Sequence, residues 1–564
     1  MSRSRESDGT GILEGARARR IPATPGRRAD AARSRTAAAR GALPLWAALP
    51  VAVTGGLLTA LAFPGRSFWP LVFVGVPLVL LALAGRTIAS SLLVGLAGGL
   101  SFWLTLISWL TVYLGPEPWL ALAGLEALFY AAGCVLIALA WRFGDLVLPR
   151  GIGRLGVVPI LVAALWSLRE HVSSTWPYGG FSWGRLAFSQ SEGPFAGLAA
   201  WVGASGLGFL LAWVCALIVQ VVRIRIADAA TAGGRGRLRP AAQAMLPVAL
   251  VLALVAVPAF PVETSGSIRV AAVQGDSDAG LFSSYVPGEI LENHLNATEP
   301  LYGTDVDLVV WPENASDLDP LRIPQAASAL DRVTTRLDAP MIVGTITEDG
   351  DDVYNSLLLW KAGEGAVDQY DKLHPVPFAE YIPDRDFWYP LAPDLLSLIP
   401  RDYTLGTRDN VFDVDGVLAG LAICFDIVDD ELVRQMIDGG AGLIVAPTNN
   451  ADFGRTEESV QQLAIARLRA IETGRSVVNT STVGTSAIIG PTGETIDILP
   501  TFTPGSMVQD VPLSSTTTPA TVAGRGIDDG VSLAGLAGLL LLGGVAARRR
   551  RSPRRAAGRR RGRS

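Results

Sequence analysis

Cysteine and histidine are scarce in this chain of 564 residues. There are three of each, and none of the cysteines forms a CxxC pair: Cys134, Cys215, Cys424, His171, His294 and His374. A disulfide scaffold needs more cysteines, and a structural zinc site needs a closer set of Cys and His ligands. We therefore expect neither kind of protein, and no metal or other cofactor.

Charged residues are also few, at 18% of the chain, against 49% hydrophobic residues. The mean hydropathy of +0.36 is too high for a water-soluble protein with long polar tails. This composition predicts an integral membrane protein.

Long apolar stretches follow residue 40, and most approach the roughly 20 residues that a helix needs to cross a bilayer. Seven are expected before residue 261: Gly41–Phe63, Trp69–Ala84, Ile88–Leu114, Trp119–Trp141, Leu155–Leu168, Phe195–Val222 and Ala241–Phe260. The sequence thus predicts a seven-helix transmembrane domain at 41–260 and a last transmembrane helix at 531–547.

Arginine is concentrated at the two ends of the chain. Residues 1–40 hold ten arginines and four acidic residues, and residues 548–564 hold ten arginines and no acid. By the positive-inside rule, both tails are cytoplasmic, and residues 261–530 lie outside the cytoplasm. The first tail has the composition of a disordered segment. A nucleic-acid arm is the alternative reading of the arginine runs, but no aromatic interleaving or recognisable fold accompanies them, so no nucleic acid is expected as a partner.

Residues 261–513 have a different pattern, in which short β-rich runs alternate with helical segments. The expected strands are Ile268–Gln274, Asp307–Trp311, Met341–Ile346, Tyr354–Trp360, Val417–Ile423, Gly442–Ala446, Ser476–Thr480 and Ser486–Ile489. The expected helices are Glu289–Glu299, Pro324–Leu337, Asp430–Gly439 and Glu457–Gly474. This alternation predicts an α/β domain. Residues 514–530, rich in Ser, Thr, Pro and Gly, are typical of a flexible linker.

Polar groups suited to catalysis follow three of these runs. Glu313 comes just after a buried strand, where desolvation raises a carboxyl pKa toward the range of a general base. A second segment delivers Lys372 and, eight residues on, Glu380. The run Val417–Ile423 ends at Cys424. Each residue alone has an ordinary structural explanation, but a nucleophile, a base and a cation that all follow strands favour catalysis.

Several short motifs in a fixed order resemble one family, and the resemblance extends over residues 41–547. They are Trp311-Pro312-Glu313, Lys372 with Pro377-Phe378-Ala379-Glu380-Tyr381-Ile382-Pro383, Ile423-Cys424-Phe425-Asp426, Thr448-Asn449-Asn450-Ala451 and Arg469-Ala470-Ile471-Glu472-Thr473-Gly474-Arg475. The sequence resembles the apolipoprotein N-acyltransferases of bacterial envelopes, which are membrane-embedded members of the nitrilase, or carbon–nitrogen hydrolase, superfamily.

The resemblance implies a membrane bundle of about eight transmembrane helices with an extracytoplasmic nitrilase-like αββα sandwich, located in the bacterial inner membrane. It implies that Glu313 is the general base, Lys372 the catalytic lysine, Cys424 the nucleophile and Glu380 a second essential carboxylate. The implied donor is a membrane phospholipid, and the implied acceptor is the α-amino group of an S-diacylglyceryl cysteine in an apolipoprotein. Nothing in the sequence argues for an oligomer, so a monomer is expected.

Three positions depart from the family pattern. Phe425 stands where tyrosine is frequent, Asp426 where glutamate is common, and Asp452 where many members carry an aromatic residue. These departures bear on lipid or acceptor preference more than on the type of reaction.

Other readings of the same residues remain open. His374, two residues from Lys372, could activate the thiol in place of Glu313, although a loop histidine is more often merely solvated. A membrane-anchored amidase or nitrilase-type hydrolase would use the same Glu–Lys–Cys set with water as acceptor, but one span would suffice to anchor it. A scaffold protein without activity is a third reading, against which the three intact residues count.

The segment 387–399 is too apolar for an ordinary solvated loop and follows Glu380 closely. We expect it to dip into the outer leaflet as a lid or arm that gives lipid access to the thiol, with Trp388 and Leu395 as its apolar contacts. The alternative is that it packs inside the α/β domain.

Overall fold

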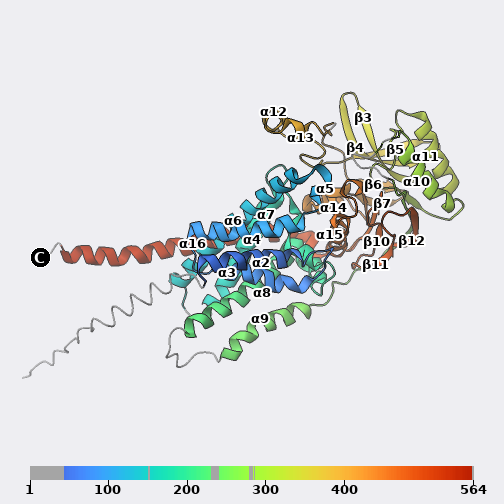
Figure 1. The fold of residues 1–564 in the computed structure, drawn as a ribbon. Coiled ribbons are helices and arrows are strands. Elements are labelled where there is room, and N and C mark those ends of the chain that lie inside the picture. The colour runs from blue at the N-terminus through green and yellow to red at the C-terminus, as the bar shows by residue number, and fades with distance from the viewer. Residues whose placement is uncertain are drawn as a thin grey trace, which may run out of the picture.

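The computed structural model describes residues 43–149, 153–229, 240–277, 284, 286–399 and 401–561. The expected disordered tail 1–40 lies outside the described residues. Figure 1 shows two parts, a helical region and an α/β region at one end of it. The helical region comprises residues 43–255 and the last helix, and the α/β region comprises residues 266–513.

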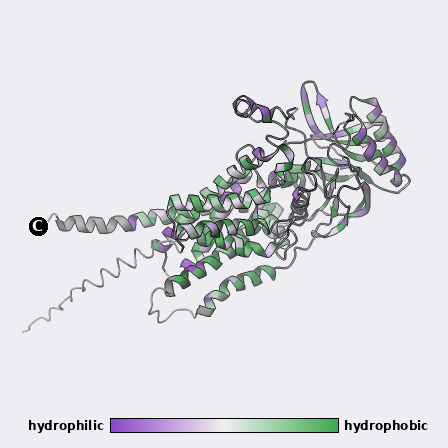
Figure 2. Cartoon of the chain, viewed as in Figure 1, coloured by the Kyte–Doolittle hydropathy of each residue, from purple (hydrophilic) through white to green (hydrophobic). Residues whose placement is uncertain are grey.

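Apolar helices build the first part. They are α2 (Leu45–Ala60), α3 (Val72–Leu83), α4 (Ile88–Leu106), α5 (Leu110–Leu114), α6 (Pro116–Val147), α7 (Val158–Thr175), α8 (Ala199–Ala229), α9 (Pro240–Val255) and α16 (Pro519–Arg561). Among the described residues, five helical spans are long and apolar enough to cross a membrane, and three shorter apolar helices accompany them. Figure 2 shows hydrophobic residues along these helices, and hydrophilic residues gathered on the outer elements of the α/β region. The chain is a membrane protein, while the number and orientation of its spans stay predictions.

Glycine lets α2 approach α3 and α4 closely. A β-carbon at Gly55 would lie 2.7 Å from the carbonyl oxygen of Gly75, and one at Gly56 would lie 2.2 Å from that of Gly98. Small residues at such crossings allow backbone-to-backbone packing, which holds helices together where lipid removes the hydrophobic driving force.

Two expectations for the helical segments are wrong. The apolar stretch Ile88–Leu114 is not one helix, because α4 ends at Leu106 and α5 is a separate short helix. The linker expected at 514–530 is helical from Pro519 onward, because proline suits the first position of a helix and the Thr518 hydroxyl accepts from the backbone N–H of Thr521 at 3.2 Å.

Two six-stranded sheets form the α/β region. The first has the order β12-β1-β2-β3-β4-β5 and the second the order β11-β10-β9-β8-β7-β6. The strands are β1 (Gly266–Gln274), β2 (Leu308–Val310), β3 (Met341–Asp349), β4 (Asp352–Lys361), β5 (Gly365–Asp371), β6 (Val411–Val414), β7 (Val417–Leu421), β8 (Leu443–Thr448), β9 (Ser476–Ser481), β10 (Ala487–Ile489), β11 (Thr495–Ile498) and β12 (Gly505–Leu513). The pairs β1–β2–β3 and β7–β8–β9 are parallel, and the outer pairs are antiparallel.

The sheets pack face to face, with helices on both outer faces. One apolar core contains residues of both sheets, such as Val270 and Leu308 of the first and Leu421 and Val445 of the second. Helices α10 (Glu289–Thr298) and α11 (Pro324–Leu337) cover the first sheet, and α14 (Asp430–Asp438) and α15 (Glu458–Thr473) cover the second. The region is thus a four-layer α/β/β/α sandwich (Figure 1).

Helix α15 also joins the two parts of the molecule. Gln461 on α15 is buried, and its Oε1 accepts hydrogen bonds from the indole N–H groups of Trp109, at 3.1 Å, and Trp183, at 2.6 Å. Its Nε2 donates to the carbonyl oxygen of Leu106 at 3.2 Å. The α/β region is therefore built against the helices through specific polar contacts as well as apolar packing.

Candidate active site

Strand ends of both sheets meet around one cavity of about 970 Å³. Glu313 follows β2, Lys372 follows β5 and Cys424 follows β7, and all three line the cavity with Glu380. The structure thus brings together the four residues expected to carry chemistry. Their catalytic roles stay predictions.

Lys372 is 1% exposed and lies between two carboxylates. Its Nζ is 2.8 Å from Oε2 of Glu380 and 3.7 Å from Oε1 of Glu313. Burial acts to lower the pKa of Lys372, but the charges of Glu380 and Glu313 outweigh it and hold the pKa well above its ordinary value. The site therefore keeps a fixed ammonium group beside the cavity.

Both oxygens of Glu313 accept hydrogen bonds. Oε1 accepts from Nδ2 of Asn355 at 2.7 Å, and Oε2 accepts from the backbone N–H of Asn449 at 2.7 Å. Burial raises the pKa of Glu313, while the Lys372 ammonium and these two donors pull it back. A carboxylate held in this way is oriented and basic enough to take a proton.

Glu380 is held by three donors. Besides Lys372, it accepts from Nδ2 of Asn355 at 3.0 Å and from the backbone N–H of Val376 at 2.6 Å. Asn355 therefore bridges the two carboxylates through one amide nitrogen.

Cys424 opens a short 3₁₀ turn, Cys424–Val428, directly after the second-sheet strand β7. Its φ of +52° is in the left-handed region, which non-glycine residues adopt at a cost of about 1–3 kcal/mol. Burial raises the pKa of the Cys424 thiol and the charge of Glu313 raises it further, against the lowering effect of Lys372. The resting group is a neutral thiol, so it needs a base to become a nucleophile.

Asp426 supports this turn from within the sandwich and does not line the cavity that holds Cys424. It is fully buried, and its Oδ2 accepts from the backbone N–H of Ile423 at 3.1 Å and from the Tyr370 hydroxyl at 2.8 Å. Burial raises the pKa of Asp426 to about 7. The ring of Phe425 stacks on Phe181 and Trp183 of the helical region, with centroids 5.9 and 6.1 Å apart.

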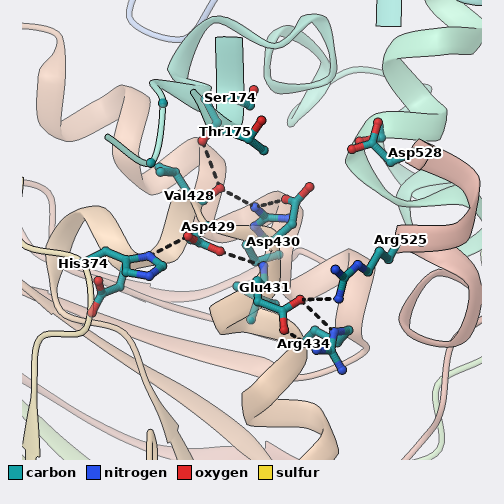
Figure 3. A pocket seen from close by; sticks show the side chains of 18 of the residues that line it. Ser174, Thr175, His374, Val428, Asp429, Asp430, Glu431, Arg434, Arg525 and Asp528 are labelled. Carbon is teal, nitrogen blue, oxygen red and sulfur yellow. Dashed lines mark hydrogen bonds and ion pairs between the residues drawn. The ribbon is translucent and has the colours of Figure 1, made fainter. Parts of the chain in front are cut away.

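His374 belongs to a different cavity, of about 810 Å³, between α7, α14 and the start of α16. Figure 3 shows its ring directed at Asp429, with Nδ1 2.7 Å from Oδ2 of that residue. Asp429 in turn caps α14 by accepting from the backbone N–H groups of Glu431 and Leu432. His374 thus has a partner in this second cavity and is not among the residues that line the first, which favours Glu313 over the Cys–His scheme.

The apolar segment after Glu380 forms two short helices, α12 (Arg385–Trp388) and α13 (Pro393–Leu396), which stand apart from the sheets in Figure 1. It has its own small core around Ile382, Leu396 and Ile399, with Trp388 packed against it and Leu395 half-buried. The Trp388 indole donates to the Tyr178 hydroxyl of the helical region at 3.1 Å. Asp452 lines the cavity that contains Cys424.

Three contributors to the site were not expected from the sequence: Asn355, the backbone N–H of Asn449, and Tyr113. Asn355 was the easiest of the three to predict, because the expected strand Tyr354–Trp360 is mostly apolar. A polar residue in such a strand signals a specific hydrogen-bond partner. Tyr113 on α5 lines the cavity and donates its hydroxyl to the carbonyl oxygen of Ala379 at 3.3 Å. Nothing in the local sequence indicates that a residue from an apolar helix reaches this cavity.

The fold and the residues at its strand ends define a carbon–nitrogen hydrolase domain joined to apolar helices, and the carbon–nitrogen hydrolase family model matches residues 269–519. The model of the apolipoprotein N-acyltransferase N-terminal domain matches residues 55–217. The chain belongs to the apolipoprotein N-acyltransferase family.

Relatives with that name match both regions of the chain. The apolipoprotein N-acyltransferase of Mycolicibacterium smegmatis is 33% identical over 534 residues, covering 89% of this chain and 86% of the relative. That of Photobacterium profundum is 26% identical over 490 residues, covering 84% and 91%. A solved amidase from Nesterenkonia sp. is 17% identical with a TM-score of 0.33, covering 45% of this chain and 94% of the amidase.

Proposed function

We propose that this chain is an apolipoprotein N-acyltransferase, which moves an acyl chain from a membrane phospholipid to the α-amino group of the S-diacylglyceryl cysteine of an apolipoprotein. The observation that carries the proposal is that Glu313, Lys372 and Cys424 face one cavity in a chain of this family. The apolar helices supply the setting in which both lipid substrates reach that cavity.

In the first step, Glu313 takes the thiol proton and Sγ of Cys424 attacks the ester carbonyl carbon of the phospholipid. The Lys372 ammonium stabilises the negative charge of the tetrahedral oxyanion. The carbon–oxygen bond to the glycerol then breaks, Glu313 returns the proton to the leaving oxygen, and a lysophospholipid departs. The acyl group remains on Cys424 as a thioester.

In the second step, the acceptor amine attacks the thioester carbonyl and loses a proton to Glu313. The carbon–sulfur bond breaks, the proton returns to the sulfur, and an amide forms. Glu380 and Asn355 hold Lys372 and Glu313 in place during both steps, because Glu380 pairs with Lys372 and Asn355 donates to both Glu313 and Glu380.

The test uses the purified full-length chain in detergent with phospholipid carrying a labelled acyl chain. We expect a hydroxylamine-sensitive label on the wild type and none on Cys424→Ala or Glu313→Gln. A synthetic diacylglyceryl lipopeptide should then convert the thioester to a labelled amide. Release of the label only as free fatty acid would identify a hydrolase, and the absence of a Cys424-dependent adduct would contradict catalysis altogether.

The proposal includes a topology in the bacterial inner membrane. Domain limits at 41–260, 261–513 and 531–547, with both arginine-rich tails cytoplasmic and the α/β region extracytoplasmic, agree with the positive-inside pattern. Figure 1 supports this, since the α/β region and the C-terminal end of α16 lie at opposite ends of the helical region. Membrane-impermeant labelling of single cysteines introduced at Asp368 and Arg549 should modify the first in intact spheroplasts and the second only after lysis.

We also propose that the segment formed by α12 and α13 gives lipid access to Cys424. Phe387 and Leu391 expose more than 60% of their surface, and the segment follows Glu380 within the chain. Replacing Trp388 and Leu395 with Ser should slow acyl transfer from phospholipid in membranes while leaving the chain folded, which circular dichroism measures. Normal transfer by this double variant would contradict the role.

A further inference from the structure

Glu458, in the first turn of α15, is buried behind Cys424 and has no part in the steps above. We propose that Glu458 is a positioning residue, which tunes the Cys424 thiol through a relay of Asn450, Gln462 and Thr448. The inference rests on the proposed function only in that it assigns a catalytic task to Cys424, and its test needs no lipid substrate.

A continuous series of hydrogen bonds joins Glu458 to Thr448. Nδ2 of Asn450 lies 2.8 Å from Oε2 of Glu458 and 2.8 Å from Oε1 of Gln462. The same Gln462 oxygen accepts from the Thr448 hydroxyl at 2.9 Å. Thr448 is the last residue of β8, which pairs in parallel with β7, so it lies beside the turn that begins at Cys424, and it lowers the pKa of that thiol.

The relay is buried and held at its centre. Glu458, Asn450, Gln462 and Thr448 are each no more than 3% exposed. Oδ1 of Asn450 accepts from the Ser481 hydroxyl at 2.6 Å, so the amide group is fixed at both of its ends. Buried polar groups in such a network are costly to leave unpaired, which gives each member one preferred orientation.

Thr448 is the point at which the relay acts on the sulfur. A hydroxyl has a single proton to donate, so Thr448 donates either to Gln462 or to the sulfur. Donation to the sulfur stabilises the thiolate and lowers the pKa of Cys424. Gln462 competes for that proton, and the strength of its competition depends on how Asn450 and Glu458 hold its oxygen.

The charge of Glu458 also acts on the Cys424 thiol. Burial raises the pKa of Glu458 to about 8, the charge of Glu313 raises it further, and Asn450 opposes this. The carboxyl is therefore mainly protonated at neutral pH. Its ionised form raises the pKa of Cys424, so protonated Glu458 keeps a second negative charge away from the thiolate.

Two titratable groups interact electrostatically with Glu458. Glu313, after β2, and Cys424, after β7, are the groups whose charges interact with it. Glu457, the residue just before α15, forms an ion pair with Arg66 of the helical region at 2.6 Å. Glu457 is thus a matched control, adjacent in sequence and acidic but directed at a different partner.

The experiment measures the rate at which iodoacetamide alkylates Cys424 in the full-length protein in detergent, from pH 6 to pH 10, by quantifying the Cys424 peptide. The thiolate is the reactive form, so the profile reports the thiol directly. Glu458→Gln keeps a neutral hydrogen-bonding group, and we expect it to alkylate about threefold faster than wild type at pH 9, a shift of about half a pH unit. Thr448→Val should alkylate more slowly than wild type at pH 7, because the hydroxyl that stabilises the thiolate is lost, while Thr448→Ser should restore the rate.

Glu457→Gln should leave the alkylation profile unchanged. The proposal is overturned if Glu458→Gln superimposes on wild type, or if Glu457→Gln shifts the profile equally. If Glu458→Gln does not fold, the pair Thr448→Val and Thr448→Ser tests the same relay from its other end. Failure of acyl transfer itself would leave this profile unaffected, so the two outcomes are distinguishable.

Discussion

Arg469 on α15 donates its Nε to the carbonyl oxygen of Ile427 at 3.0 Å and so ties that helix to the turn that begins at Cys424. A second guanidinium nitrogen contacts the carbonyl oxygen of Val428 at 2.8 Å and Asp430 at 2.6 Å. Asp430 also binds Arg185 of the helical region at 2.8 Å. Two buried arginines and Asp430 therefore link the turn Cys424–Val428 to the helical region.

Replacing Arg469 with Met should lower the stability of the α/β region. The change removes the buried donor of the Ile427 and Val428 carbonyl oxygens, and a buried acceptor left unpaired costs about 1–3 kcal/mol, while Asp430 keeps its ion pair with Arg185. Thermal melting in detergent measures the loss. The control is Arg434→Met, which removes surface pairs with Glu431 and Asp438 and should cost less than about 1 kcal/mol. Equal losses would contradict a special role for the buried guanidinium.

Replacing Asn355 with Ala should shift the pH–rate profile of thioester formation, so that its acidic limb lies at higher pH. Asn355 lowers the pKa of Glu313 by donating to its carboxylate, so removing the donor leaves burial less opposed and the pKa rises. The measurement is the rate of acyl-enzyme formation from labelled phospholipid between pH 5 and pH 8. The neighbouring change Ser356→Ala, which removes a contact with Asp371, is the control. If the acidic limb of the profile is the same in Asn355→Ala and wild type, protonation of Glu313 does not limit the rate at low pH.

Much of this architecture was predictable because burial imposes clear patterns. All eight strands expected in the α/β region form, and the helix Pro324–Leu337 has the predicted limits, since Ala326, Leu330, Val333 and Leu337 are buried at helical spacing. Four strands, β5, β6, β11 and β12, were missed because each contains no more than two buried residues, which weakens the apolar signal.

The residues of the site also include some that the sequence predicts and some that it does not. Glu313, Lys372 and Cys424 follow strands, so their convergence could be anticipated. Asn355 and Tyr113 could not be placed, because their roles depend on which strand pairs with which and on how the helical region meets the sandwich. The helix that begins at Pro519 was not predicted, because the composition of residues 514–530 is typical of linkers. Its start depends on the position of Thr518, whose hydroxyl accepts from the backbone N–H of Thr521, and composition does not reveal that contact.

Asp426 should make the stability of the protein depend on pH. Its pKa is about 7 in the folded chain, against about 3.9 for an ordinary Asp, so the folded state binds more protons between these values. Stability must then fall as pH rises from about 4 to about 7, by up to about 1.4 kcal/mol per pH unit. Asp426→Asn removes this dependence, so its melting temperature relative to wild type should rise across that window and stay constant above it. Parallel curves for the two proteins would contradict the assignment.

Phe425 and Trp183 should be energetically coupled across the two regions. Their rings are nearly parallel, at an angle of 5°, and stacked aromatic pairs contribute about 0.5–1.5 kcal/mol beyond their buried area. A double-mutant cycle with Phe425→Leu and Trp183→Leu, read by unfolding in denaturant, measures this coupling. The pair Phe425→Leu and Leu330→Ala, whose residues belong to separate apolar clusters, should be additive within about 0.5 kcal/mol. Additivity in the first cycle would show that the stack carries no energy of its own.

Gln461 also decides what the α/β region can do alone. Its amide oxygen takes the indole donors of Trp109 and Trp183, and its amide nitrogen binds Leu106, so every one of these partners belongs to the helical region. Proteolysis of both connections to the helical region, between Val255 and Gly266 and between Leu513 and Pro519, would not release a working soluble enzyme, because the freed fragment would lose Tyr113 from the wall of its own cavity. Catalysis by this chain therefore requires the helical region as well as the α/β region.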